Sequence, residues 1–311
     1  MTNQRKIDEK KFINCSLDFH QRLMVYSFFN ITVSEDADMS VNAEKFGTAQ
    51  KSRAFLPGLL AGVLVAALVI LTGVWLMQQQ PAQSSAEENK AAVLEAAAVD
   101  QIDAGNPETA IKMLTEAISM APRRSEPYYY RAVAYAKIGQ FEAAVEDFNT
   151  AADANPHWAL PLAGRASAQA ALGNLPEAIA DLDKAINLEP GEGSLYANRG
   201  QLHHQNGELE QAKEDLDMAV QLSPELVAAH FNRGVLLFAL GNTQGALEDF
   251  TKAITLDPAQ APPYFNRGLI YAELGQNEPA IADLEHFVQI SDNPAWVDLA
   301  QTKLTELESG K

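Results

Sequence analysis

Small and apolar positions recur every 34 residues along most of the chain. Four series of residues keep this spacing, one of glycines, one of prolines and two of alanines. Four series at one spacing indicate a structural repeat rather than chance. They are Gly105, Gly139, Gly173, Gly207, Gly241 and Gly275; Pro122, Pro156, Pro190, Pro224 and Pro258; Ala110, Ala144, Ala178, Ala212, Ala246 and Ala280; and Ala117, Ala151, Ala185, Ala219 and Ala253.

The pattern within each repeat predicts two helices. The first helix ends near the glycine, because glycine readily adopts the left-handed conformation found at helix ends. The second often begins with a proline in its first turn, as at Pro107 and Pro176, and the later proline ends it. A large apolar position between the two helices is held by Leu114, Phe148, Leu182, Leu216, Phe250 and Leu284. Because neither helix can bury its apolar face alone, the repeats must stack into a solenoid.

The spacing of large and small residues in these units resembles the tetratricopeptide repeat family. In the sixth unit the family's positions are held by Tyr264, Gly268, Tyr271, Ala280 and Leu284. The resemblance covers six units, residues 91–294. It implies an all-α fold, a right-handed superhelical solenoid of helix-turn-helix repeats. The family's usual tryptophan is replaced by Tyr128, Leu162, Tyr196, His230 or Tyr264.

Residues 295–311, after the sixth unit, are predicted to form a capping helix and a short tail. The stretch AWVDLAQTKLTELE, from Ala295 to Glu308, has an amphipathic pattern. With Trp296, Leu299, Ala300 and Leu304 facing inward, this helix would close the exposed end of the core.

A long apolar run at residues 54–77 predicts one transmembrane helix. It contains 24 residues without a charge. At ~1.5 Å per residue such a helix is about 36 Å long, against a hydrocarbon core of about 30 Å. A cleaved signal peptide is the alternative, with SSA at 84–86 as the cleavage site. However, the apolar stretch of such peptides is only about 7 to 15 residues long.

The charges beside this run predict its orientation. Lys45, Lys51 and Arg53 precede it, whereas Glu87 and Glu88 follow it. Positive charges favour the cytoplasmic side, so the N-terminus is predicted to be cytoplasmic. The repeats would then be extracytoplasmic, whether periplasmic, lumenal or extracellular.

Two polar segments flank the predicted span. Residues 1–53 are expected to be a flexible cytoplasmic segment, and residues 78–90 a linker to the repeats. Met39 opens the compact polar and basic flank MSVNAEKFGTAQKSR and is an alternative translation start.

The acidity of the chain is concentrated in the repeats. The net charge is -18, from 23 basic and 41 acidic residues. Residues 1–53 carry 8 of the basic and 7 of the acidic residues, which leaves 15 and 34 in residues 54–311. Such a domain repels phosphate backbones, so nucleic-acid binding is not expected.

An arginine and an aspartate sixteen residues later are predicted to form an ion pair in units two to six. The first unit has Ala97 and Met113 at these places, so it lacks both charges together, as a paired interaction requires. The predicted pairs are Arg131 with Asp147, Arg165 with Asp181, Arg199 with Asp215, Arg233 with Asp249, and Arg267 with Asp283. The glycine after the arginine in the last three units, Gly200, Gly234 or Gly268, is predicted to be a close-packing position.

The asparagine before this arginine occurs only in the last three units, so packing does not require it. The resemblance implies that this place borders a concave groove, where an asparagine can hold the backbone of a bound extended peptide. A solvated amide on the helix surface is the alternative. The predicted groove residues are Tyr129, Val133, Asn198, His204, Phe231, Asn232, Val235, Phe238, Phe265, Asn266 and Leu269.

The expected partner is a polypeptide with apolar side chains. Chaperone-binding members of the family grip a C-terminal carboxylate with lysines, an arginine and asparagines. The corresponding lysine places hold Tyr129, Ala163, Ala197 and Phe231 here. An acidic tail is therefore not the expected ligand.

No catalytic motif is found in the sequence. It has no phosphate-binding glycine loop, no HExxH pair and no nucleophile elbow. The adjacent His203 and His204 would point to different faces of a helix, which disfavours a metal site, and no cofactor is expected.

The predicted function is that of a membrane-anchored scaffold or assembly factor for a membrane or envelope complex. It would bind partner polypeptides in its concave groove without catalysis. One alternative is a receptor on an organelle surface with cytosolic repeats. Another is an enzyme whose site the sequence does not reveal.

Overall fold

The computed structural model describes residues 86–309. Within this range the chain forms helices joined by short turns, and no strand occurs there. A helix over 86–103 comes first. It is followed by α3 (Pro107–Met120), α4 (Glu126–Lys137), α5 (Phe141–Ala154), α6 (Ala159–Ala171), α7 (Leu175–Leu188), α8 (Gly193–Gln205), α9 (Leu209–Leu222), α10 (Val227–Ala239), α11 (Thr243–Leu256), α12 (Ala261–Glu273), α13 (Asn277–Ile290) and α14 (Pro294–Ser309).

The N-terminal predictions lie mostly outside the described residues. This holds for the segment 1–53, the transmembrane helix 54–77 and the first part of the linker. No helix between residues 86 and 309 is both long and apolar enough to cross a membrane. Residues 86–90 of the predicted linker are helical and continue directly into the helix that begins the repeats. Alanine, glutamate and lysine in this stretch favour a helix, and Lys90 Nζ lies 3.2 Å from Glu116 Oε1 of α3.

The helices form six antiparallel pairs, as the sequence predicts. The pairs are 86–103 with α3, α4 with α5, α6 with α7, α8 with α9, α10 with α11, and α12 with α13. The turn inside each pair contains the repeating glycine, whose φ lies between 70° and 84°. A Cβ at these glycines would meet open space, so the left-handed backbone, rather than crowding, explains the residue type. The prolines Pro107 and Pro176 lie in the first turns of α3 and α7, which confirms their predicted place.

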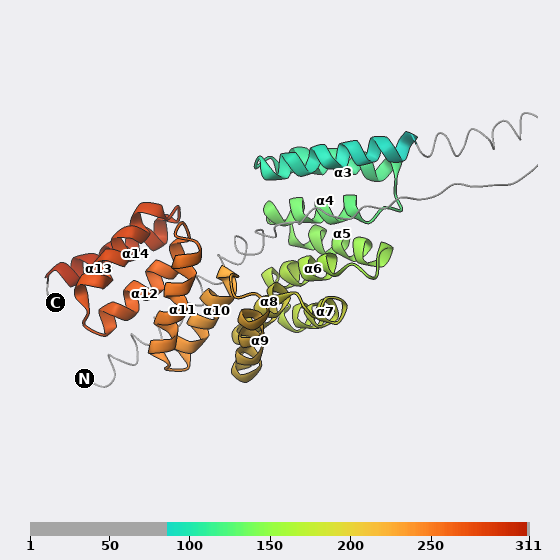
Figure 1. The fold of residues 1–311 in the computed structure, drawn as a ribbon. Coiled ribbons are helices and arrows are strands. Elements are labelled where there is room, and N and C mark those ends of the chain that lie inside the picture. The colour runs from blue at the N-terminus through green and yellow to red at the C-terminus, as the bar shows by residue number, and fades with distance from the viewer. Residues whose placement is uncertain (1–85, 310–311) are drawn as a thin grey trace, which may run out of the picture.

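The pairs stack along a curved path that bends near α8 and α9 (Figure 1). The second helix of each pair contacts the first helix of the next, as α5 contacts α6 and α11 contacts α12. First helices of neighbouring pairs also contact each other, α4 with α6 and α8 with α10. In a curved stack the elements on the inner side are closest together, so the first helices line the inner side.

The core is a row of small clusters between helices rather than one centre. The predicted large apolar positions are all buried, with exposed fractions of 0 to 2%. The two alanine series are 0% exposed, which lets the helix backbones approach each other closely. At Gly234 a Cβ would lie 2.9 Å from Phe250 Cε1, and at Gly200 it would lie 2.8 Å from Leu216 Cγ. Both positions are therefore close-packing positions, as predicted.

The five predicted ion pairs are present, and each is bidentate. The arginine Nε lies 2.6 to 2.8 Å from one aspartate oxygen, and Nη2 lies 2.6 to 2.9 Å from the other. The aspartates are only 4 to 6% exposed. Two parallel, charge-assisted hydrogen bonds give the pair a defined geometry as well as energy. Each pair therefore holds the first helix of a unit against the second.

Each of these arginines has a further partner that the sequence analysis missed. Its Nη1 donates to an oxygen sixteen residues earlier, on the second helix of the preceding unit. These bonds run from Arg131 to Thr115 (3.1 Å), Arg165 to Asn149 (2.7 Å), Arg199 to Asp183 (2.7 Å), Arg233 to Asp217 (3.1 Å) and Arg267 to Thr251 (3.0 Å). The signal is visible in the sequence, because an oxygen-bearing side chain holds this place in all five preceding units.

The capping helix α14 closes the C-terminal end of the core. Trp296 is 7% exposed, and its ring centroid lies 5.1 Å from that of Phe265. Ala300 is fully buried and Leu304 packs against the same cluster, so these three predictions are confirmed. The prediction that Leu299 faces inward is wrong, because this residue is 38% exposed. The inward stripe continues instead to Leu307, since steps of three or four residues from Trp296 through Ala300 return to one face.

We expect the two acidic partners of Arg199 to contribute unequally to stability. Asp215→Ala should lower the free energy of unfolding by about 3 kcal/mol, because it leaves a largely buried cation without its bidentate partner. Asp183→Ala should cost about 0 to 1 kcal/mol, since the Asp183 side chain is 53% exposed. Urea unfolding followed by circular dichroism measures both, and equal costs would contradict this assignment.

We expect the same contrast between two residues of α14. Trp296→Ala should cost about 3 to 5 kcal/mol by opening a cavity against Phe265. Leu299→Ala, on the exposed face, should change stability by about 0.5 kcal/mol or less. Urea unfolding of the two variants beside the parent chain provides the measurement. A large loss from Leu299→Ala would show that α14 packs in another register.

Candidate functional site

The predicted groove residues all lie on first helices. They occupy α4 (Tyr129, Val133), α8 (Asn198, His204), α10 (Phe231, Asn232, Val235, Phe238) and α12 (Phe265, Asn266, Leu269). Because the first helices line the inner side of the curve, the structure gathers these residues along that side. Their exposure divides them into two groups.

Three of the predicted groove residues belong to the core. Tyr129 is 7% exposed, with its ring centroid 4.7 Å from that of Trp158 and 5.7 Å from that of Phe148. Burial, followed by the neighbouring Tyr130, raises the pKa of Tyr129 well above its usual value. Phe265 is 2% exposed between Phe287 and Trp296.

Val235, the third, is 7% exposed in the cluster around Phe250. These three side chains lie beneath the inner surface and pack in the core. In this conformation they offer little area to a ligand.

Asn232 is also buried, unlike the other two asparagines of its series. It is 7% exposed, and its Nδ2 donates to Gln201 Oε1 of α8 at 3.3 Å. This bond joins the first helices of two neighbouring pairs. Asn198 and Asn266 are partly exposed at the equivalent places, so they are the asparagines that a ligand could reach.

The remaining predicted residues are partly exposed, and three of them form an apolar strip. The strip consists of Phe231 and Phe238 on α10 with Leu269 on α12. Phe231 packs at the edge of two core clusters, one shared with Phe238 and the other with Leu269. Val133 and His204 are also partly exposed. His204 lies on α8, the first helix that contacts α10, whereas Val133 lies farther away on α4.

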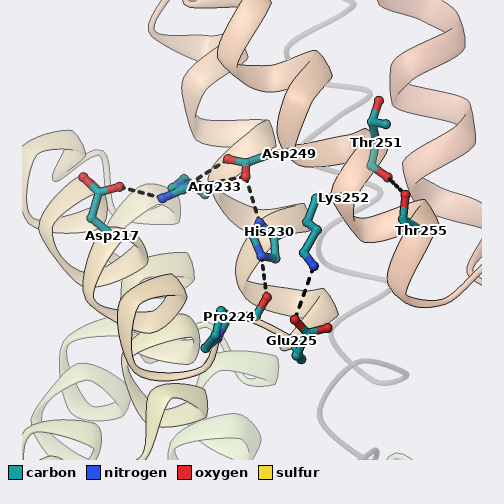
Figure 2. Close-up of polar contacts among 9 residues, drawn as sticks. All are labelled: Asp217, Pro224, Glu225, His230, Arg233, Asp249, Thr251, Lys252 and Thr255. Carbon is teal, nitrogen blue, oxygen red and sulfur yellow. Dashed lines mark hydrogen bonds and ion pairs between the residues drawn. The ribbon is translucent and has the colours of Figure 1, made fainter.

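His230 is the centre of a buried polar network that the sequence analysis did not foresee (Figure 2). Its Nδ1 lies 2.9 Å from Asp249 Oδ1, and its Nε2 lies 2.9 Å from the carbonyl oxygen of Pro224. Both neighbours are hydrogen-bond acceptors, so a proton on either ring nitrogen has an acceptor within reach. Burial raises the pKa of Asp249, but hydrogen bonds from His230 and Arg233 outweigh this effect and lower the pKa overall.

This network connects four parts of the fold. Asp249 on α11 binds both His230 and Arg233 of α10. Arg233 also contacts Asp217 of α9 at 3.1 Å, and His230 binds the turn at Pro224. These contacts link the fourth unit to the fifth, so the network stabilises the packing of two neighbouring units.

The two adjacent histidines do not share a site. His203 Nδ1 contacts Glu208 Oε2 at 2.5 Å, and its Nε2 lies 3.7 Å from Asp215 Oδ2. In the part of the chain that the structure describes, no three histidine, cysteine or acidic side chains gather as metal ligands would.

Comparison with protein families finds matches along much of the repeat region. Models described as tetratricopeptide repeat match residues 95–157, 227–260 and 261–294. A model described as TPR repeat matches residues 200–241. These matches confirm the resemblance inferred from the sequence. Comparison with curated proteins finds no match.

Solved structures show the same fold at low sequence identity. The chain is similar to the APC/C hetero-tetramer Cut9–Hcn1, with a TM-score of 0.64 and 18% identity, over 74% of this chain and 46% of that one. It therefore spans less than half the length of that relative. It is also similar to a tetratricopeptide repeat protein from Parabacteroides merdae ATCC 43184, with a TM-score of 0.59 and 22% identity, over 80% and 94% of the two chains.

A thermophilic TPR protein from Thermus thermophilus matches with a TM-score of 0.52 and 20% identity, over 58% of this chain and 99% of that one. These identities show the fold alone. Together, the paired helices, the repeating glycine turns and the four family matches lead to one conclusion: the chain belongs to the tetratricopeptide repeat family.

Proposed function

We propose that this chain is a membrane-anchored scaffold or assembly factor that holds an extended segment of a partner polypeptide along α8, α10 and α12. Its tetratricopeptide repeat fold is typical of protein–protein interaction. The observation that carries the proposal is the apolar strip of Phe231, Phe238 and Leu269, because it lies on the inner helices and is partly exposed. Asn198 and Asn266 beside it can donate hydrogen bonds to a peptide backbone.

The partner's bound segment should be apolar. Large apolar side chains at the surface of a repeat domain mark interaction sites when they lie together. The four lysine places of the carboxylate clamp hold Tyr129, Ala163, Ala197 and Phe231, and the first three are buried. A clamp for an acidic C-terminus therefore has no counterpart at these places.

Energetics favour a partner in the same membrane. Three apolar anchors at about 2 kcal/mol each give about 6 kcal/mol, and association costs of about 4 kcal/mol or more remove most of it. Sharing a membrane raises the effective concentration of the partner and makes such weak binding productive. The apolar residues 54–77 supply the proposed anchor. The basic residues before this span support repeats on the far side of the membrane.

We expect partners to crosslink from the inner side of the repeats. A photoreactive phenylalanine analogue at Phe238 or Leu269, in native membranes, should capture the same partner polypeptide. The analogue at Met218, which is 38% exposed on the second helix α9, serves as the matched control and should capture little. Mass spectrometry identifies the adducts, and capture from Met218 alone would overturn the proposed groove.

We expect the repeat domain to lie on the non-cytoplasmic side of the membrane. In sealed vesicles with a known orientation, a protease added on the cytoplasmic side should leave residues 86–309 intact until detergent is added. Immunoblotting against the C-terminus follows the fragment. Digestion without detergent would contradict this topology and favour the alternative, a receptor with cytosolic repeats.

A further inference from the structure

One position of the first helix is held by a ring in four of the six units. The residues are Tyr128, Tyr196, His230 and Tyr264, at the place of the family's usual tryptophan. In three of them the ring's polar atom reaches back to the carbonyl of the proline that ends the preceding unit. The distances are 3.3 Å from Tyr128 Oη to Pro122, 3.3 Å from Tyr196 Oη to Pro190, and 2.9 Å from His230 Nε2 to Pro224.

In the three units with a tyrosine, the arginine three residues later lies over the ring. The guanidinium carbon is 5.7 Å from the ring centroid for Arg131 and Tyr128, 5.6 Å for Arg199 and Tyr196, and 5.9 Å for Arg267 and Tyr264. At these distances a cation is attracted to the face of an aromatic ring. In the second and fourth units the ring therefore contacts both a proline carbonyl and an arginine.

The third unit keeps the proline and the arginine but has Leu162 where the ring would be. An open pocket of about 400 Å³ lies beside Leu162. Its lining includes Pro156 and Arg165, the third unit's counterparts of the prolines and arginines that hold the rings elsewhere. A leucine side chain is shorter than a tyrosine side chain and has no hydroxyl group to reach a carbonyl.

The other walls of the cavity suit a neutral aromatic group. Trp158 and Leu188 line it with apolar surface. Arg165 already donates to Asp181 from Nε at 2.7 Å and from Nη2 at 2.6 Å. Lys184 Nζ lies 3.4 Å from the same carboxylate. With both cations beside Asp181, a neutral ring fits this place better than an anion does.

We propose that this cavity, the Leu162 pocket, binds the phenol ring of a tyrosine side chain from a partner polypeptide. The ring would lie beside Arg165 and Trp158, with its hydroxyl group donating to the carbonyl oxygen of Pro156. The partner's ring would then make in the third unit the two contacts that Tyr128 and Tyr196 make in the second and fourth units, one to a proline carbonyl and one to an arginine. None of the lining residues belongs to the predicted groove, so the pocket is a separate site and does not rest on the function proposed above.

The first test uses p-cresol, which is the tyrosine side chain as a free molecule, with the full-length chain. Titration should move the indole N–H signal of Trp158 in an NMR spectrum in a saturable way at millimolar concentrations. Replacing Trp75 and Trp296 in turn assigns that signal. Toluene, which lacks the hydroxyl group, should bind several-fold more weakly at equal free concentration, measured from the probe's own signals. Equal binding of the two probes would overturn the assignment of a phenol.

The second test fills the pocket from within. Leu162→Tyr should abolish the p-cresol shift and keep or raise the thermal midpoint, because the new ring occupies the place that Tyr196 occupies in the next unit. Leu160→Tyr, two residues earlier on α6 and outside the lining, is the matched control and should leave the shift unchanged. A p-cresol shift that survives Leu162→Tyr would overturn the proposal. A lowered midpoint in that variant would also overturn it, because a ring would then not fit the pocket.

Discussion

The bidentate pair between an arginine and an aspartate is the interaction on which the repeat framework depends. The helices pack through alanines and large apolar side chains, and apolar contacts of this kind have little directionality. The arginine adds direction, because two of its nitrogens bind the aspartate of its own unit and a third binds the second helix of the preceding unit. One side chain thus sets the position of three helices. The first unit lacks the pair, but its Thr115 accepts from Arg131, so it is tied to the stack as well.

Buried charges are tolerated here because they are satisfied as a set. A carboxylate that is only 4 to 6% exposed would be costly without partners. Each one receives two charge-assisted hydrogen bonds, and these bonds raise the pKa of the arginines. In the fifth unit His230 adds a further bond, so that the turn at Pro224 joins the same network. Polar groups therefore specify how the units pack, while the small alanines allow the helix backbones to approach each other closely.

Sites arise where a unit departs from this framework. The chain's own rings hold one place of the first helix in four units, whereas the third unit has Leu162 there with an open pocket beside it. The asparagine position on the inner helices also differs between units. Asn232 is used within the fold to bind Gln201, whereas Asn198 and Asn266 stay partly exposed. A repeat with one scaffold can in this way present different surfaces along its length.

The sequence by itself determined the repeating framework, because its period reports positions that every unit must fill alike. It predicted the helix pairs, the glycine turns, the small interface residues and the five ion pairs. Only the tertiary structure decided which inner residues are accessible. Tyr129 and Phe265 are buried by Trp158 and Trp296, two residues that do not repeat. A period places a side chain on one face of a helix, but its burial depends on what a neighbouring segment brings to that face. For the same reason Leu299, on the last helix, faces solvent instead of the core.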